Sequence, residues 1–152
     1  MCYNQLIEVF HIEVCGSRKY NQEIELGKEV YVMSKETLEY VVTKAKELIA
    51  APSCSAEAKE AAQAWIAAVG TDKQAEETKK FIAEMEEDII PIDGLIAFAE
   101  SDAGAKVFGG PEKAKGVAEH GREIKAAGAK YCDCPACAAC EAILAKKDEI
   151  LA

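Results

Sequence analysis

The sequence contains few aromatic residues, prolines and histidines. Aromatic side chains make up 7% of its 152 residues, and it has four prolines and two histidines. Because proline interrupts a helix unless it stands in the first turn, prolines that lie almost only at segment edges favour helical stretches between them. His120 is the one histidine after residue 33, and no Ser–His–Asp set is apparent, so a hydrolase of that kind is not expected.

Long apolar runs and an excess of basic charge are also missing. No stretch is apolar for long enough to span a bilayer, and the N-terminus has no signal-peptide pattern, so we expect a cytoplasmic protein without a membrane partner. Asp and Glu outnumber Lys and Arg by 27 to 18, which gives a formal net charge of −9. Nucleic-acid backbones select basic surfaces, so we expect no nucleic-acid partner.

Residues 33–152 carry the apolar spacing of amphipathic helices. Leu38, Val41, Val42 and Ala45 recur at i, i+3 and i+4 intervals, and similar stripes follow in later segments. Gly, Pro and Ser separate these segments, so we predict an all-α fold, a compact bundle of about six short helices. The predicted limits are Ser34 to Pro52, Ser53 or Ser55 to Gly70, Thr71 to Pro91, Asp93 to Phe108 with an irregularity at Gly104, Pro111 to Gly128 and Pro135 to Ile150.

Residues 1–32 differ from the rest of the chain. Alternating apolar residues flank a Gly27-Lys28 turn, a pattern typical of a short β-hairpin, and a disordered extension is the alternative. The genetic code offers a further interpretation. Lys28-Glu29-Val30 is encoded by AAGGAGGTN, the ribosome-binding signal of many bacteria, and Met33 follows where an initiator codon is expected. Residues 1–32 are then an N-terminal extension, upstream sequence read in frame, and residues 33–152 are the helical domain.

Four of the seven cysteines lie close together near the C-terminus, from Cys132 to Cys140. Their clustering, without a signal peptide, favours reduced thiols over a disulfide scaffold. Pro135 suits the first turn of a helix, which makes Cys134 the N-cap. There the sulfur can accept backbone N–H groups, and the positive helix end favours the thiolate. Cys132 and Cys137 flank this position, so three sulfurs are predicted to converge.

Three converging thiols predict a metal site. Tetrahedral zinc takes four N or S donors, and structural sites usually combine a short knuckle with donors from a distant segment. The distant cysteine that also stands just before a helix is Cys54, in Ala51-Pro52-Ser53-Cys54-Ser55. We therefore predict a zinc site made by Cys54, Cys132, Cys134 and Cys137, with Cys140 as the substitute if Cys54 is too far away.

Other interpretations of these cysteines remain open. Cys134-Pro135-Ala136-Cys137 at a helix start is also the form of a dithiol redox pair. An iron–sulfur cluster is the less favoured metal centre, because Glu141 follows the Cys-x-x-Cys-x-x-Cys run where ferredoxins continue to a further Cys and Pro. The thiols can also serve as small buried hydrophobic side chains. His120, among charged neighbours, is a reserve donor.

Three stretches of the chain are similar to those of a known family. They are Glu47-Leu48-Ile49-Ala50-Ala51-Pro52-Ser53-Cys54, Ala64-Trp65-Ile66-Ala67-Ala68-Val69-Gly70-Thr71 and Tyr131-Cys132-Asp133-Cys134-Pro135-Ala136-Cys137. From Met33 onward the chain resembles small helical proteins of anaerobic Firmicutes that are often labelled as a molecular chaperone of the ninety-kilodalton heat-shock class. That chaperone class needs an ATP-binding domain with Gly-rich lid segments, which residues 33–152 do not contain. The resemblance therefore implies the fold and the cysteine cluster, and no established activity.

These patterns lead to three hypotheses about function. The first is a non-enzymatic metal-binding protein in which zinc pins the C-terminal helix to the loop at Cys54. The second is a thiol redox protein in which Cys134 attacks and Cys137 resolves. The third is a chaperone-like or adaptor module whose helical groove binds a protein partner.

Overall fold

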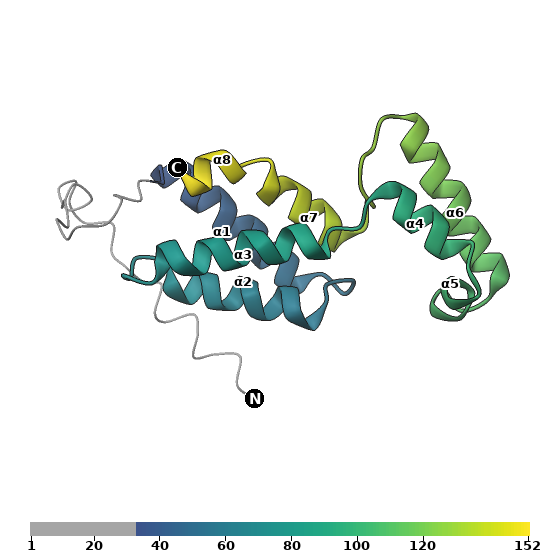
Figure 1. Cartoon of the computed structure of the whole chain (residues 1–152), viewed down its shortest axis with the longest axis horizontal. Helices are drawn as coiled ribbons and strands as arrows, with labels where there is room; N and C mark the ends of the chain where they lie inside the picture. The colour runs from purple at the N-terminus through teal and green to yellow at the C-terminus, as the bar shows by residue number, and fades with distance from the viewer. Residues whose placement is uncertain (1–32) are drawn as a thin grey trace. The chain divides into compact units, whose positions relative to one another are not determined.

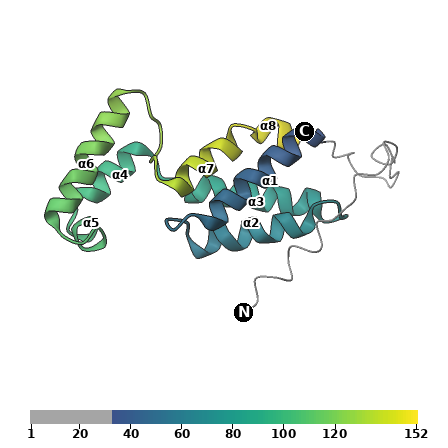
Figure 2. The same cartoon turned by 180° about the vertical axis from the view of Figure 1, so that it is seen from behind.

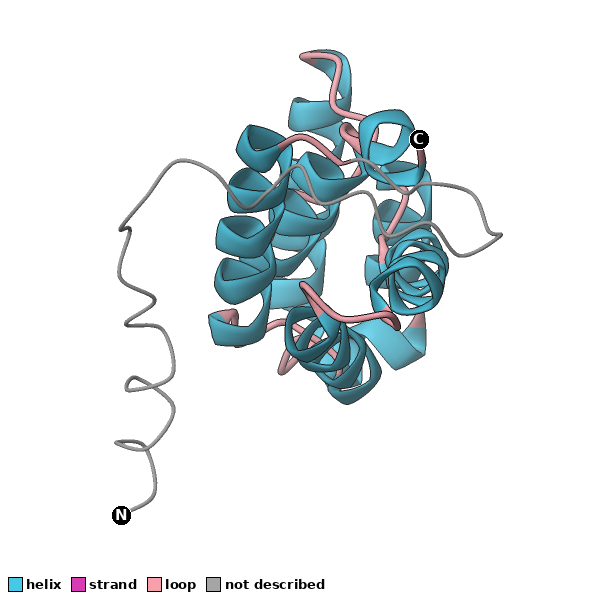
Figure 3. Cartoon of the chain, turned by 90° about the vertical axis from the view of Figure 1, so that its left-hand side faces the viewer, coloured by secondary structure: helices cyan, strands magenta, loops and turns pink. Residues whose placement is uncertain are grey.

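The computed structural model describes residues 33–152, and this part of the chain is all-α, as predicted (Figure 1). Short loops join the helices (Figure 3). The hairpin predicted within residues 1–32 lies outside the described residues. No helix in the described part of the chain is long and apolar enough to cross a membrane. The helices are α1 (Lys35–Ala50), α2 (Ala56–Ala68), α3 (Gln74–Asp88), α4 (Ile92–Ala99), α5 (Asp102–Val107), α6 (Pro111–Ala126), α7 (Pro135–Leu144) and α8 (Lys147–Leu151).

Serine side chains set the start of three helices. Ser34, Ser55 and Ser101 precede α1, α2 and α5, and each hydroxyl accepts the backbone N–H three residues later, at 3.1, 3.0 and 3.0 Å. Each bond satisfies an N–H group that has no partner within the helix. Ser55 also donates to Asp88 Oδ2 at 2.7 Å, which ties the start of α2 to the end of α3.

Two of the predicted helices are each divided in the structure. The segment predicted as one helix up to Phe108 contains both α4 and α5, because the Ser101 hydroxyl caps a new helix start. Gly104 permits the close turn, since a Cβ there would collide with the Phe98 carbonyl oxygen. The segment from Pro135 likewise contains α7 and α8. The described residues therefore form eight helices instead of the predicted six.

Trp65 of α2 and Phe81 of α3 lie at the centre of the packing. Both side chains are fully buried, and their rings stack with centroids 5.1 Å apart. Trp65 Nε1 donates to Thr78 Oγ1 at 2.9 Å, so the indole N–H has an acceptor inside the core. The same continuous cluster of buried side chains includes Cys54, Cys132, Cys137 and Cys140.

Two short segments join α4, α5 and α6, which pack mainly on one another, to the other helices. Figure 2 shows these segments between α3 and α4 and between α6 and α7. The Ile92 amide donates to the Lys130 carbonyl and the Cys132 amide to the Ile90 carbonyl, both at 2.9 Å. An antiparallel bridge lies between these two bonds. Because Cys132 belongs to this pairing, the C-terminal cysteines stand beside the connection.

We expect Thr78→Val to lower the free energy of unfolding by about 1–3 kcal/mol, because it leaves the buried Trp65 N–H without this acceptor while hardly changing volume. Thr43→Val is the matched control. Thr43 is exposed on α1 and donates to the Glu39 carbonyl at 2.9 Å, so its replacement should change stability by less than about 0.5 kcal/mol. Urea unfolding followed by circular dichroism measures both, and equal losses would contradict the importance of the Trp65–Thr78 bond.

Candidate metal centre

Three cysteines of the C-terminal motif come together at the start of α7. Cys132 lies in the connecting segment, Cys134 is the N-cap of α7, and Cys137 stands in the first turn. Their sulfur atoms all lie within 4.8 Å of one another, in an arrangement that can hold a metal ion. All five cysteines of residues 33–152 are free thiols, so no disulfide competes for these sulfurs in the described part of the chain.

The separation of the three sulfurs suits a single metal ion. With Zn–S bonds of about 2.3 Å and tetrahedral angles, two thiolates on one zinc lie about 3.8 Å apart. The three sulfurs already lie within 4.8 Å of one another, so only small side-chain movements are needed for them to bind one ion. An iron–sulfur cluster carries one thiolate on each iron of a four-iron cluster and two on each iron of a two-iron cluster, so three thiolates never share one iron atom and some of their sulfurs are held farther apart. The spacing thus favours a mononuclear centre.

Each of the three sulfurs also accepts a backbone N–H group. The Cys134 amide donates to Cys132 Sγ at 3.4 Å, and the Cys137 amide donates to Cys134 Sγ at 3.5 Å. The Ile90 amide donates to Cys137 Sγ. Hydrogen bonds of this kind are stronger to a thiolate than to a thiol, because the acceptor is charged. The backbone around the cluster therefore favours thiolates, the form in which cysteine binds metal.

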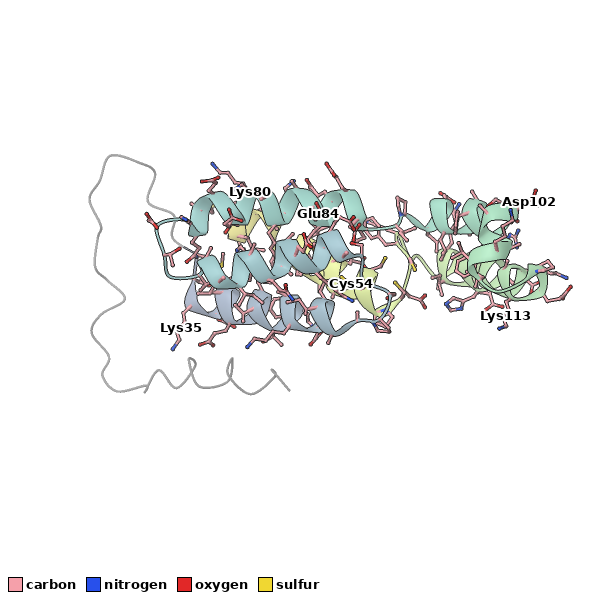
Figure 4. The ribbon with its side chains drawn as sticks, turned by 90° about the horizontal axis from the view of Figure 1, so that it is seen from below. Lys35, Cys54, Lys80, Glu84, Asp102 and Lys113 are labelled. Carbon is pink, nitrogen blue, oxygen red and sulfur yellow. The ribbon has the colours of Figure 1, made fainter. Side chains whose placement is uncertain are left out.

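The loop before α2 lies against the same helix start. Ser53 Oγ accepts the Ala136 amide at 3.3 Å, and the Ser53 hydroxyl donates to the Cys134 sulfur. Cys54 follows directly; it is 9% exposed, and its side chain lies among the helices (Figure 4). The structure thus brings the Cys54 loop to the cluster, although Cys54 Sγ is not within 4.8 Å of all three sulfurs.

Burial and hydrogen bonding act differently on the four predicted ligands. Burial raises the pKa of the Cys54, Cys132 and Cys137 thiols above the ordinary value. Burial also acts on Cys134, but hydrogen bonds from the Ser53 hydroxyl and the Cys137 amide outweigh it and lower the pKa of that thiol. Cys134 is therefore the readiest thiolate, and the other three release protons when a metal binds.

The two reserve donors, Cys140 and His120, lie outside the set of converging sulfurs. Cys140 is 2% exposed, and its Sγ donates to Met85 Sδ at 3.5 Å. Burial raises the pKa of the Cys140 thiol to about 12. His120 is half exposed on α6, and its Nε2 lies 2.8 Å from Asp133 Oδ2. Each side chain therefore has another contact in this structure, and His120 links α6 to the cysteine motif.

Two contributors to the site were not predicted from the sequence. The Ser53 hydroxyl and the Ile90 amide both donate to cysteine sulfurs. The role of Ser53 could have been predicted, because it is the neighbour of the predicted ligand Cys54 and its hydroxyl can donate a hydrogen bond. The role of Ile90 could not have been predicted, because its amide reaches the cluster only through the pairing of two segments that are distant in the sequence.

No family model matches the chain, and no curated protein or solved structure is detectably similar to it. The chemistry of the site therefore rests on its own geometry. Within residues 33–152 that geometry is a cluster of three reduced cysteines, Cys132, Cys134 and Cys137, that can hold a metal ion.

Proposed function

We propose that the protein binds one zinc ion in a structural site with four thiolate ligands. The observation that best supports this proposal is that each clustered sulfur accepts a backbone N–H group. In metalloproteins such outer partners orient the ligands and are needed for full affinity. Zinc in structural sites takes four S or N donors in a closed tetrahedron, and thiolates are its common ligands there. The 4.8 Å limit on sulfur separations supports one ion over an iron–sulfur cluster.

Cys54 is the proposed fourth ligand. Its loop is held to the start of α7 by the hydrogen bond between Ser53 Oγ and the Ala136 amide, 3.3 Å long. Burial raises the pKa of Cys54, but Lys59 acts in the opposite direction and favours its thiolate. Cys140 is less suited, because its thiol lies deep in the core against Met85. Zinc binding then requires the Cys54 side chain or its loop to move toward the other three sulfurs.

The proposed role of the zinc is to join three parts of the chain. Cys54 lies between α1 and α2, Cys132 lies in the segment after α6, and Cys137 belongs to α7. Because the Cys132 amide pairs with the Ile90 carbonyl at 2.9 Å, the ion also fixes the connection to α4. Four protein ligands leave no open position for a substrate, so the role is stabilising rather than catalytic. The N-terminal end of α7 helps to offset the formal charge of about −2 on zinc and four thiolates.

Metal content and thiol reactivity of protein purified without added metal test this proposal. We expect elemental analysis by inductively coupled plasma mass spectrometry to find one zinc per chain. We also expect the thiols to react slowly with a labelling reagent until a chelator removes the zinc. Metal-free protein with a rapidly reacting thiol would contradict the proposal and favour a redox protein. Several iron atoms per chain would contradict it in favour of an iron–sulfur cluster.

Ser53→Ala is expected to weaken zinc binding about 10–100-fold, as the loss of an outer partner of a ligand usually does. The variant removes the hydroxyl that donates to Cys134 and accepts the Ala136 amide. Ser101→Ala is the control, because it removes an N-cap hydroxyl from α5 instead. Competition with a chromogenic chelator measures both dissociation constants. An unchanged constant for Ser53→Ala would show that Ser53 does not support the site.

A further inference from the structure

We propose that hydrogen peroxide oxidises Cys134, and that Cys137 then forms a disulfide with it and releases the zinc. This inference rests on the proposed zinc site and adds to it a modification site and a means of regulation. Two features support it. One cysteine of the cluster is partly exposed, and the sulfur of a second cysteine lies close to its own.

Cys134 is the most exposed cysteine of the cluster. It is partly exposed, whereas Cys132 and Cys137 are 7% and 4% exposed. Its chain neighbours Asp133 and Pro135 are exposed as well. A small oxidant therefore meets Cys134 first. The thiolate is both the form that binds zinc and the form that attacks peroxide, so the proposed ligand is also the proposed nucleophile.

Cys137 is placed to resolve the oxidised Cys134. The two sulfurs lie within 4.8 Å of each other, and the Cys137 amide donates to Cys134 Sγ at 3.5 Å. Helix geometry places Cα atoms three residues apart at about 5 Å, inside the range of about 4.4–6.8 Å that disulfides span. Rotation of the two side chains can therefore bring the sulfurs to bonding distance without moving the backbone.

The reaction consumes one peroxide per chain. The Cys134 thiolate attacks one peroxide oxygen, the O–O bond breaks, and the departing hydroxide takes a proton to form water, which leaves a sulfenic acid. The Cys137 thiolate then attacks the Cys134 sulfur, the S–O bond breaks, and a second hydroxide leaves as water. The two thiolates lose two electrons in total, the peroxide gains them, and two protons are taken up. Exchange with an external dithiol reverses the disulfide.

The disulfide removes two of the four proposed ligands. Cys54 and Cys132 alone cannot complete a tetrahedron of thiolates, so the zinc leaves as the hydrated ion. Rotation of Cys137 toward Cys134 also weakens the bond from the Ile90 amide to its sulfur. Oxidation by peroxide therefore releases the zinc and loosens the connection between α7 and the segment before α4.

Titration of the zinc-loaded full-length protein with hydrogen peroxide tests this inference. We expect one zinc to be released per chain as two thiols are lost, and peptide mass mapping to find a Cys134–Cys137 disulfide. Cys140→Ala is the control and should behave like the wild type, because Cys140 contacts Met85 instead of the cluster. In Cys137→Ser the resolving thiol is missing. Dimedone should then trap a sulfenic acid on Cys134, whether or not that variant holds zinc.

The outcomes separate this inference from the zinc site on which it rests. Zinc-loaded protein that keeps its zinc and its thiols in peroxide would overturn the switch and leave the zinc site standing. A disulfide that includes Cys132, or a dimedone adduct on a cysteine other than Cys134, would overturn the assigned roles. Protein that takes up no zinc before the titration would overturn the proposed function itself.

Discussion

Removal of zinc with a strong chelator is expected to lower the melting temperature of the protein by about 10–20 °C. A ligand that binds only the folded state at a thousand times its dissociation constant stabilises it by about 4 kcal/mol. Structural zinc sites commonly bind tightly enough to reach that regime. The helical core should remain folded, because Trp65, Phe81 and their neighbours pack without any help from the metal.

Hydrogen exchange should locate this loss of stability. The amides of Ile92 and Cys132 pair across the connection beside the cysteines. Both should exchange faster in the chelated protein, because the proposed zinc holds Cys132 in place. The Ala114 amide, bonded to the Gly110 carbonyl at 3.0 Å at the start of α6, is the internal control and should change little. An unchanged melting temperature and unchanged exchange at both connecting amides would argue against a structural metal.

Cys137→Ser should weaken zinc binding by more than about 100-fold, because it removes a ligand of the ion itself. Loss of a residue that only hydrogen-bonds to a ligand usually costs up to about 100-fold. Serine keeps the size of the side chain but replaces the thiolate with a hydroxyl, which is a poor zinc ligand at neutral pH. The matched variant is Cys140→Ser, which makes the same change one turn later on α7, where the sulfur contacts Met85.

Competition titrations compare the two serine variants directly. Circular dichroism must first show that both variants keep their helical content, since Cys137 and Cys140 are 4% and 2% exposed and a buried hydroxyl costs stability. The expected result is a large loss of affinity for Cys137→Ser and near wild-type affinity for Cys140→Ser. Loss of zinc in Cys140→Ser, with Cys54→Ser unaffected, would move the fourth ligand from Cys54 to Cys140.

Much of the helical architecture could be predicted from local sequence. Apolar spacing and serine caps such as Ser34 and Ser55 mark helix starts by short-range chemistry, which acts in the same way wherever the segment ends up. The division at Ser101 was missed because the apolar stripe continues past it to Phe108. The sequence did indicate an irregularity at Gly104, and the Ser101 cap and the close approach of Gly104 to the Phe98 carbonyl show that a new helix begins there.

The local part of the candidate site could be predicted from the sequence, and its long-range contacts could not. Convergence of Cys132, Cys134 and Cys137 follows from their spacing around Pro135, which determines where the helix begins. The contact of the Ile90 amide with Cys137 could not be predicted, because it depends on how the segment between α3 and α4 pairs with the segment between α6 and α7. The exact reach of a remote ligand such as Cys54 depends on the same long-range packing.

X-ray absorption spectroscopy at the zinc edge, on protein purified without added metal, identifies the atoms bound to the proposed zinc ion. We expect a single zinc ion with four sulfur neighbours at about 2.3 Å, in agreement with closed tetrahedral thiolate sites. A first shell dominated by oxygen or nitrogen, or a spectrum without zinc, would contradict it.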